Sequence, residues 1–234
     1  MVSLENQVAI VTGAGRGIGR AIAVELGRLG MRVALVARTR SELEETAGAV
    51  PGSMVFPADL RVESEVQHVV EATEGKLGAI DVLVNAAGVY HFGPVTEASE
   101  EDFDRVINTN LKGIFLTCRS VLPHMTKRKR GQIINIASIA GNGGSAGRSL
   151  YCASKFGVVG FTESLYQEVR EYGVRVSLIC PGSTNTTFSP KESKGKARGR
   201  MLQPEDVAHA VRMLLGQEAN SFISEVVMRP TMKS

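Results

Sequence analysis

Tyr151 and Lys155 form the residue pair whose types and spacing best suit proton-transfer chemistry. Residues four apart on a helix share one face, so the lysine ammonium would lie near the tyrosine hydroxyl. A free tyrosine hydroxyl has a pKa of about 10, and a neighbouring cation stabilises its phenolate form. The pair could therefore exchange a proton with a substrate near neutral pH, although a surface helix pair without any catalytic role has the same spacing.

Short apolar runs rich in β-branched residues alternate with longer stretches of helical period along the whole chain. The predicted strands are residues 8–12, 33–37, 53–56, 82–85, 132–136, 175–179 and 225–228, and the predicted helices are residues 17–29, 41–50, 63–75, 99–128, 151–172 and 204–215. Strands that are apolar on both faces belong in a parallel sheet covered by helices on each side. We therefore predict an α/β fold, a single Rossmann-type domain over residues 1–234 with a doubly wound parallel sheet of about seven strands.

Several polar residues stand just after the predicted strands. Asp59 follows the third strand, Asn85 ends the fourth and Ser138 follows the fifth. The carboxyl ends of parallel strands meet at one edge of a sheet, where open α/β sheets bind their ligands. We expect these residues to gather there with Tyr151 and Lys155, which stand at the start of a helix.

Residues 12–19, Thr-Gly-Ala-Gly-Arg-Gly-Ile-Gly, lie where the first strand turns into the first helix. Glycines at such a turn let the backbone approach a pyrophosphate, which then sits at the positive end of the helix. The spacing of Gly13, Gly17 and Gly19 differs from the common dinucleotide fingerprint, and a tight turn alone would also account for a glycine cluster. The strand before the turn and the helix after it favour a nucleotide site.

The end of the second strand bears on which nucleotide is bound. Residues 36–40 read Val-Ala-Arg-Thr-Arg, with no carboxylate before Glu42. Sites for NAD usually place an acidic residue in this region to bond the ribose 2′-hydroxyl. Arg38 and Arg16 could instead hold the 2′-phosphate of NADP, although both could also be solvated surface residues. We therefore expect NADP(H), with NAD(H) as the alternative.

Five motifs closely resemble those of the short-chain dehydrogenase/reductase family in order and spacing: the glycine turn at 12–19, the Asn-Ala-Ala-Gly run at 85–88, Asn110, Ser138 and the pair Tyr151 and Lys155. The resemblance covers nearly the whole chain and implies hydride transfer between a nicotinamide cofactor and a carbonyl or secondary alcohol. It implies that Tyr151 is the general acid for reduction and the base for oxidation, and that Lys155 lowers its pKa and bonds the nicotinamide ribose. Ser138 would hold the substrate oxygen, and Asn110 would support a water relay from Lys155 to solvent.

The same resemblance implies the contacts to the cofactor. Asp59 and Leu60 would flank the adenine, residues 85–88 the adenosine ribose, and Thr184 and Thr186 the nicotinamide carboxamide. The full set of predicted cofactor-binding residues is Gly13, Arg16, Gly17, Ile18, Gly19, Arg38, Asp59, Leu60, Asn85, Ala86, Gly88, Tyr151, Lys155, Pro181, Gly182, Thr184 and Thr186.

Two alternatives to a general carbonyl reductase remain open. The first is a 3-oxoacyl-(acyl carrier protein) reductase, in which the basic turn at 127–130 would dock an acidic carrier protein; such a run is also common in solvated turns. The C-terminus lacks the Val-Asp-Gly-Gly ending typical of those reductases and looks more like the branch that acts on small hydroxy acids and general ketones. The second is a non-catalytic NADP-sensing protein on the same fold, which would be expected to lose Tyr151 or Lys155.

Composition and charge exclude several classes of partner. The net charge of +3 is too small and too evenly spread for a nucleic-acid-binding protein, and no apolar run is long enough to span a bilayer. Cys118, Cys152 and Cys180 make neither a metal spacing nor an even disulfide set, and the four histidines are scattered. We expect a cytoplasmic protein that binds no metal and acts on a small molecule.

Two loops are candidates for the substrate pocket. Residues 188–200 are polar and carry five cations with no apolar period, which predicts a flexible substrate lid that orders on ligand binding. Its charge could favour an anionic substrate, or the lid could simply be solvated. His91 and Phe92 follow the fourth strand and could line the pocket or lie on the loop surface.

The family resemblance also suggests a homo-oligomer, a tetramer or a dimer, in which the helices at 99–128 and 151–172 pack across a two-fold axis. The apolar residues Phe156, Val159, Phe161 and Leu165 are spread too widely around the second helix for one buried face. This pattern indicates a second covered surface on that helix.

Overall fold

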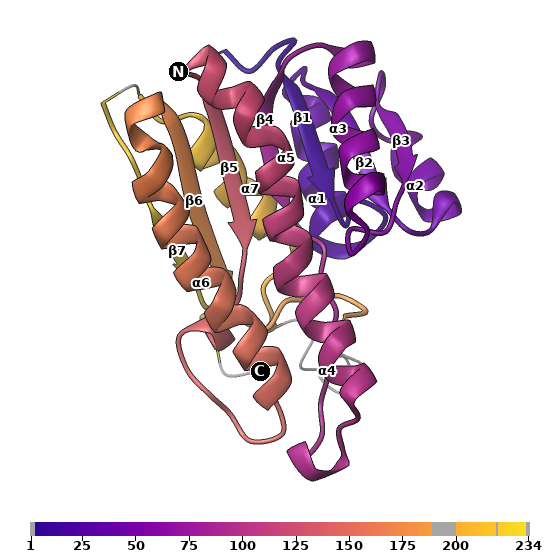
Figure 1. The fold of residues 1–234 in the computed structure, drawn as a ribbon, viewed down its shortest axis with the longest axis vertical. Helices are drawn as coiled ribbons and strands as arrows, with labels where there is room; N and C mark the ends of the chain where they lie inside the picture. The colour runs from indigo at the N-terminus through magenta and orange to yellow at the C-terminus, as the bar shows by residue number, and fades with distance from the viewer. Residues whose placement is uncertain (1–2, 189–199, 219, 233–234) are drawn as a thin grey trace.

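The computed structural model describes residues 3–188, 200–218 and 220–232. In these residues seven parallel strands form one sheet in the order β3-β2-β1-β4-β5-β6-β7 (Figure 1). The strands are β1 (Val8–Thr12), β2 (Arg32–Ala37), β3 (Met54–Pro57), β4 (Ile80–Asn85), β5 (Gly131–Ile136), β6 (Val174–Pro181) and β7 (Glu225–Met228). The sheet confirms the predicted doubly wound α/β fold, and each predicted strand lies within two residues of the observed one.

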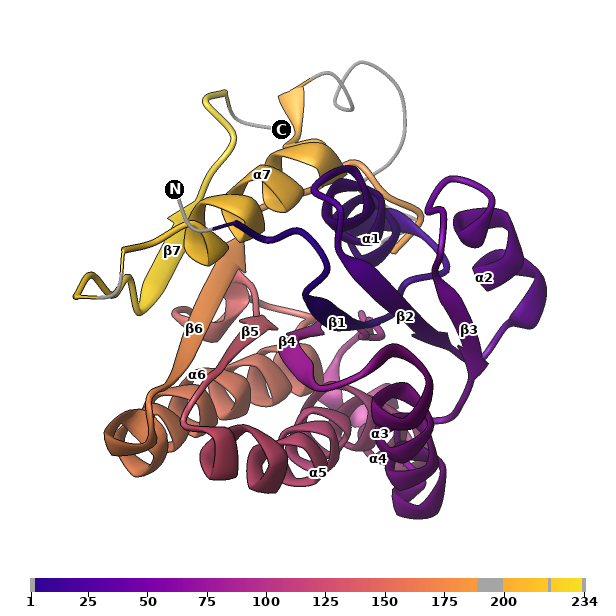
Figure 2. The ribbon, with the colours of Figure 1, turned by 90° about the horizontal axis from the view of Figure 1, so that it is seen from above.

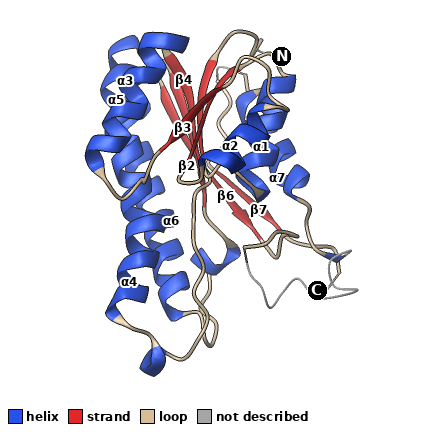
Figure 3. Ribbon diagram, turned by 90° about the vertical axis from the view of Figure 1, so that its right-hand side faces the viewer, coloured by secondary structure: helices blue, strands red, loops and turns tan. Residues whose placement is uncertain are grey.

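Helices cover both faces of the sheet (Figure 2, Figure 3). One face carries α1 (Gly17–Arg28), α2 (Arg40–Ala47) and α7 (Pro204–Leu215), and the other carries α3 (Glu63–Leu77), α4 (Glu100–Ile107), α5 (Gly113–Arg128) and α6 (Ser149–Val169). Successive residues of a strand point to opposite faces, so Ile10 packs in the core under α5 and α6 and Val11 in the core under α1 and α7. No helix in the described ranges is long and apolar enough to cross a membrane.

The helix predicted at 99–128 is helical from Glu100 to Arg128, but it contains a π-helical turn that was not predicted. A π-helical turn, η2 (Asn108–Lys112), separates α4 from α5. The Asn110 side chain in this turn hydrogen-bonds to two neighbouring segments, and no helical period in the sequence indicates the widened turn. Ser99 and Asp102 form a capping box at the start of α4.

The strand order indicates where along the sheet a ligand would bind. β1 pairs with β2 on one side and with β4 on the other, so the crossovers on its two sides run in opposite directions. Open α/β sheets bind ligands in the crevice at this switch point, outside the carboxyl ends of the strands. Thr12 and Asn85 end β1 and β4 side by side in the register, and the glycine turn starts there.

The segment predicted as a substrate lid lies mostly outside the described residues. Its first residue, Phe188, and its last, Arg200, are described, and residues 189–199 are not. The chain on either side is tied together by backbone hydrogen bonds from Asn185 to Leu202 at 2.8 Å and from Leu202 to Ser183 at 3.0 Å. The lid stays a prediction, and the chain before it and the chain after it are joined at Asn185 and Leu202.

Candidate active site

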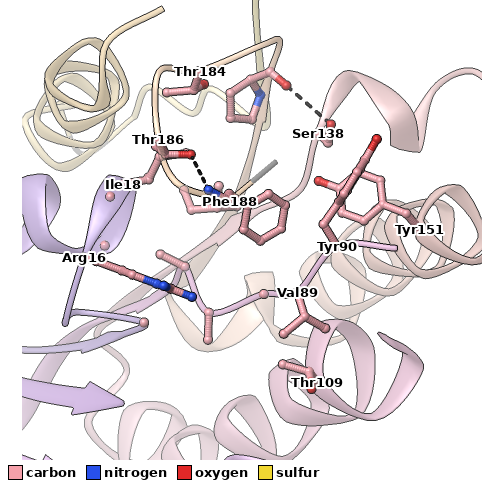
Figure 4. A pocket seen from close by; sticks show the side chains of 18 of the residues that line it. Arg16, Ile18, Val89, Tyr90, Thr109, Ser138, Tyr151, Thr184, Thr186 and Phe188 are labelled. Carbon is pink, nitrogen blue, oxygen red and sulfur yellow. Dashed lines mark hydrogen bonds between the residues drawn. The ribbon is translucent and has the colours of Figure 1, made fainter. Parts of the chain in front are cut away.

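A cavity of about 490 Å³ lies at the carboxyl edge of the sheet, a volume in the range of small-molecule sites. The predicted site residues that line it are Gly13, Arg16, Gly17, Ile18, Gly19, Arg38, Asp59, Leu60, Ala86, Gly88, Ser138, Tyr151, Lys155, Pro181, Gly182, Thr184 and Thr186. Asn85 and Asn110 are not among the described residues that line the cavity. Figure 4 shows Arg16 at one end of this cavity and Ser138 and Tyr151 at the other.

The glycine turn between β1 and α1 forms one wall of the cavity. Gly13 has a φ of +68°, and a Cβ atom there would lie 2.8 Å from the backbone of Ala87. A Cβ atom on Gly19 would collide with the carbonyl oxygen of Gly13. Because only glycine fits at these positions, the backbone can approach a ligand closely at the start of α1. This cradle fits the pyrophosphate of a dinucleotide, whose negative charge the positive helix end favours.

The ends of β2 and β3 form the wall next to the glycine turn. Arg38 is exposed and lines the cavity just after β2, while Asp59 follows β3. Arg61 donates side-chain hydrogen bonds to both carboxylate oxygens of Asp59, the shortest at 2.6 Å. These bonds, with a smaller effect of the Arg38 charge, hold the pKa of Asp59 below its ordinary value. The sequence analysis did not identify Arg61 as a partner of Asp59. The only signal for this ion pair in the sequence is the position of Arg61 two residues after Asp59.

Charges of both signs surround this end. Arg16 stands immediately before α1 and is exposed, and Glu42 lies against Gly15 from the first turn of α2. Glu42 thus lines the cavity from the helix and not from the end of β2, the region in which NAD sites usually carry their acidic residue.

Ser138, Tyr151 and Lys155 converge at the opposite end of the cavity. Ser138 follows β5 and caps a short 3-10 turn, η3 (Ile139–Gly141), where its hydroxyl accepts a hydrogen bond from the Ala140 amide at 3.1 Å. The same hydroxyl donates to the Pro181 carbonyl at 3.5 Å (Figure 4). Tyr151 lies in the first turn of α6 and is 7% exposed. The predicted convergence of a serine, a tyrosine and a lysine is therefore present.

Lys155 is held in a desolvated position behind Tyr151. Its Nζ atom donates to the Ile136 carbonyl at 2.9 Å and lies 5.9 Å from the centre of the Tyr151 ring. Burial lowers the pKa of Lys155 to about 8. The lysine is thus still mostly protonated at neutral pH, and a cation in this position stabilises a phenolate on Tyr151.

Asn110 is fully buried in the π-helical turn. Its Oδ1 accepts from the Val89 amide at 2.7 Å, and its Nδ2 donates to the Val89 carbonyl at 2.9 Å and to Ser154 at 3.0 Å. Ser154 lies on α6 between Tyr151 and Lys155. The Asn110 side chain thus ties the segment after β4 to the helix that carries the candidate catalytic pair.

Asn85 lies in the core, away from the cavity surface. Its side chain donates to Asn135 on β5 at 2.9 Å and accepts from Thr117 on α5 at 2.8 Å, and Asn135 in turn donates to Thr162 on α6 at 3.0 Å. The period of a strand explains this placement, because Asn85 points to the α5 and α6 face. The predicted contact of Asn85 with the cofactor would have to use its backbone.

Tyr90 and Arg148 are lining residues that the sequence analysis did not name, whereas Phe188 begins the segment predicted as a substrate lid and also lines the cavity. The Tyr90 ring packs edge to face on Tyr151 with 4.9 Å between ring centres, and the Phe188 ring lies 6.0 Å from that of Tyr151. The candidates named after the fourth strand, His91 and Phe92, do not belong to the described lining. The only signal in the sequence for Tyr90 as a lining residue is its position just after the Asn-Ala-Ala-Gly run.

The arrangement supports proton transfer at a bound ligand. Tyr151 can supply a proton, Ser138 can supply a hydrogen-bond donor, and Lys155 places a buried positive charge beside them, while the glycine turn can hold a phosphate group. No group of three or more histidine, cysteine or acidic residues within reach of one metal ion occurs in the part of the chain that the structure describes.

Comparisons with known proteins agree with this fold. The chain is 39% identical to an uncharacterized oxidoreductase of Staphylococcus saprophyticus over 98% of its length and 100% of that protein. It is 38% identical to the human 3-oxoacyl-[acyl-carrier-protein] reductase over 90% of this chain and 91% of that one.

A solved structure and a family model extend the comparison. The structure of a metagenomic short-chain oxidoreductase in complex with NADP superposes with a TM-score of 0.86 at 40% identity, covering 99% of this chain and 100% of that one. The model of the short chain dehydrogenase family matches residues 7–197. This chain therefore belongs to the short-chain dehydrogenase/reductase family of oxidoreductases.

Proposed function

We propose that this protein is an NADP(H)-dependent oxidoreductase that interconverts a carbonyl compound and a secondary alcohol, with Tyr151 as the general acid and base. The observation that carries the proposal is one cavity with Ser138, Tyr151 and a buried Lys155 at one end and a phosphate-sized glycine cradle at the other. A dinucleotide lying along this cavity would bring its nicotinamide to the tyrosine.

In the reducing direction the protein handles the proton. The bound cofactor supplies the hydride. Ser138 turns its hydroxyl from the Pro181 carbonyl to the substrate oxygen, and Tyr151 passes its own proton to that oxygen. The Lys155 ammonium stabilises the phenolate left on Tyr151, which is reprotonated before the next turnover.

In this scheme Asn110 has a positioning role and does not itself transfer a proton. Both hydrogens of its amide group already donate to protein acceptors, on Val89 and Ser154. In our proposal it holds α6 and the segment after β4 at a fixed separation, so that a water relay can run from Lys155 to solvent. The relay itself would use groups other than the Asn110 amide hydrogens.

The preference for NADP is supported by the charges at the adenosine end. Arg16 and Arg38 both line the cavity, and no carboxylate stands between β2 and α2. The carboxylate of Asp59 is neutralised by Arg61, so it offers little repulsion to a phosphate on the ribose. A structural relative at 40% identity was solved with NADP, which agrees with this assignment.

The second candidate is a 3-oxoacyl carrier-protein reductase, which the 38% identity to the human enzyme favours. In the basic turn that could dock a carrier protein, Arg128 donates to the carbonyl of Ile80 and Arg130 lies 3.5 Å from Asp81. These contacts give the turn a structural role of its own.

Turnover of NADPH with aldehydes, ketones, 3-oxo acids and 3-oxoacyl thioesters tests both candidates. Tyr151→Phe should reduce turnover at least ~100-fold while leaving NADPH affinity close to intact, because only the proton-donating hydroxyl is lost. Tyr166→Phe is the matched control, since Tyr166 lies on the same helix and stacks on Phe222. Binding of NADPH without turnover of any carbonyl compound would favour an NADP-sensing protein and refute the proposal.

We also propose a homo-oligomer formed through α4, α5 and α6. Large apolar side chains are exposed on all three helices: Phe103 is 48% exposed, Phe115 39% and Phe156 48%. The helix α4 packs against α6, and the Phe115 ring lies 6.5 Å from the Phe161 ring on α6, so the three helices adjoin. Covering these side chains would remove apolar surface from water.

A further inference from the structure

We propose that Arg148 binds a carboxylate of the substrate, so that the enzyme selects oxo acids and the matching hydroxy acids over neutral ketones and alcohols. This inference rests on the proposed function, because it names the substrate class that the same site would take. It concerns a residue that precedes Tyr151 by three positions and belongs to none of the motifs recognised in the sequence.

Arg148 lies at the catalytic end of the cavity. It is the residue just before α6 and lines the cavity together with Ser145 and Tyr151. Its guanidinium carbon lies 5.8 Å from the centre of the Tyr90 ring, and that ring lies 4.9 Å from the Tyr151 ring. One aromatic ring therefore separates the guanidinium group from the hydroxyl-bearing ring that we propose to be catalytic.

The charges along the cavity are divided between its two ends. The carboxylates of the described lining, on Glu42 and Asp59, lie near the glycine turn and Arg38. At the catalytic end the charged groups of the described lining are the cations of Arg148 and Lys155. The positive end of α6, which has no acidic residue in its first turn, adds to them. An anionic group on the substrate is attracted to this end, and a neutral group in its place is not.

A short oxo acid matches these groups. With its carbonyl oxygen at the hydroxyls of Ser138 and Tyr151, its carbon chain would run along the Tyr90 ring toward Arg148. The planar guanidinium group can donate two parallel hydrogen bonds to a carboxylate. The contact between the guanidinium group and the Tyr90 ring restricts the arginine side chain, which lowers the entropy cost of binding the acid.

The test compares an oxo acid with its own methyl ester at saturating NADPH, over acids whose carboxylate stands one to four carbons from the carbonyl. Wild type should prefer the acid in kcat/KM. Arg148→Gln should lower kcat/KM for the acid about 10- to 100-fold, mainly through KM, because a charge-assisted hydrogen bond used in the ground state is lost. The ester should change by less than about 3-fold, and Arg148→Lys should retain part of the preference, because it keeps the charge without the planar fork.

Arg170→Gln is the matched control. It removes one positive charge from the other end of the same helical segment, where Arg170 pairs with Glu171. Equal losses for acid and ester in Arg148→Gln, with folding confirmed by the melting temperature, would overturn the inference and leave the proposed function standing. A wild-type preference for the ester or for 3-oxoacyl thioesters would also overturn it, and no turnover of any carbonyl compound would overturn both.

Discussion

Replacing Lys155 with methionine should abolish turnover and at the same time make the cofactor-free protein more stable at neutral pH. Lys155 is 4% exposed, and burial lowers its pKa from 10.5 to about 8. At about 1.4 kcal/mol for each pKa unit, keeping the ammonium in this position costs the folded state about 3 kcal/mol at pH 7. Methionine has a similar length and no charge, so it removes this cost.

The substitution also removes one favourable contact. Lys155 donates to the Ile136 carbonyl at 2.9 Å, and leaving that oxygen without a partner costs about 1 to 3 kcal/mol. We therefore expect a net gain of about 1 kcal/mol at pH 7, or a melting temperature higher by about 2 to 4 °C for a chain of this size. The loss of turnover follows from the loss of the cation beside Tyr151.

The pH dependence of the stability difference between Lys155→Met and wild type is a sharper test. Because the pKa of Lys155 is lowered in the folded state, the unfolded chain binds more protons between pH 8 and 10.5, and wild-type stability recovers over that interval. The gain in Lys155→Met should thus shrink as pH rises from 8 to 10.5. Thermal unfolding of both proteins across this range measures it, with the exposed Lys127→Met as the control. A variant less stable than wild type at pH 7, with a difference independent of pH, would refute the reasoning.

The remaining predictions concern the cofactor, the π-helical turn and the assembly. Arg38→Asp should weaken NADPH and favour NADH in kcat/KM by losing a phosphate partner and gaining a ribose acceptor, and a wild-type preference for NADH would contradict the assignment. Asn110→Ala should cost about 2 to 4 kcal/mol in urea unfolding, because it leaves the partly buried backbone groups of Val89 and the buried Ser154 hydroxyl without these partners; a loss below about 1 kcal/mol would show that the bonds contribute little. Light scattering at micromolar concentration should give an oligomeric mass, and a monomeric mass would refute the proposed contact of α4, α5 and α6.

Much of the fold and of the site could be predicted from the sequence, because patterns within short segments of the chain indicate them. The central strands are buried on both faces, so their apolar runs stand out from the amphipathic helices between them. The glycine turn is readable because Gly13 and Gly19 fill positions that no other residue can occupy. Tyr151 and Lys155 share a helix face by spacing alone, and the edge where they meet Ser138 follows from the parallel sheet.

Only the tertiary structure decided which side chains the cavity uses. Asn85 opens a readable motif, yet its side chain turns into the core and donates to Asn135, because the register of two strands brings the pair together. In the π-helical turn, Asn110 forms hydrogen bonds to segments 21 and 44 residues away, which no local period in the sequence could indicate. Tyr90 and Arg148 come from different loops and meet beside Tyr151 through packing. Spacing along the chain specifies neighbours within one element, whereas the contacts that set charge and shape at the substrate end join residues far apart in sequence.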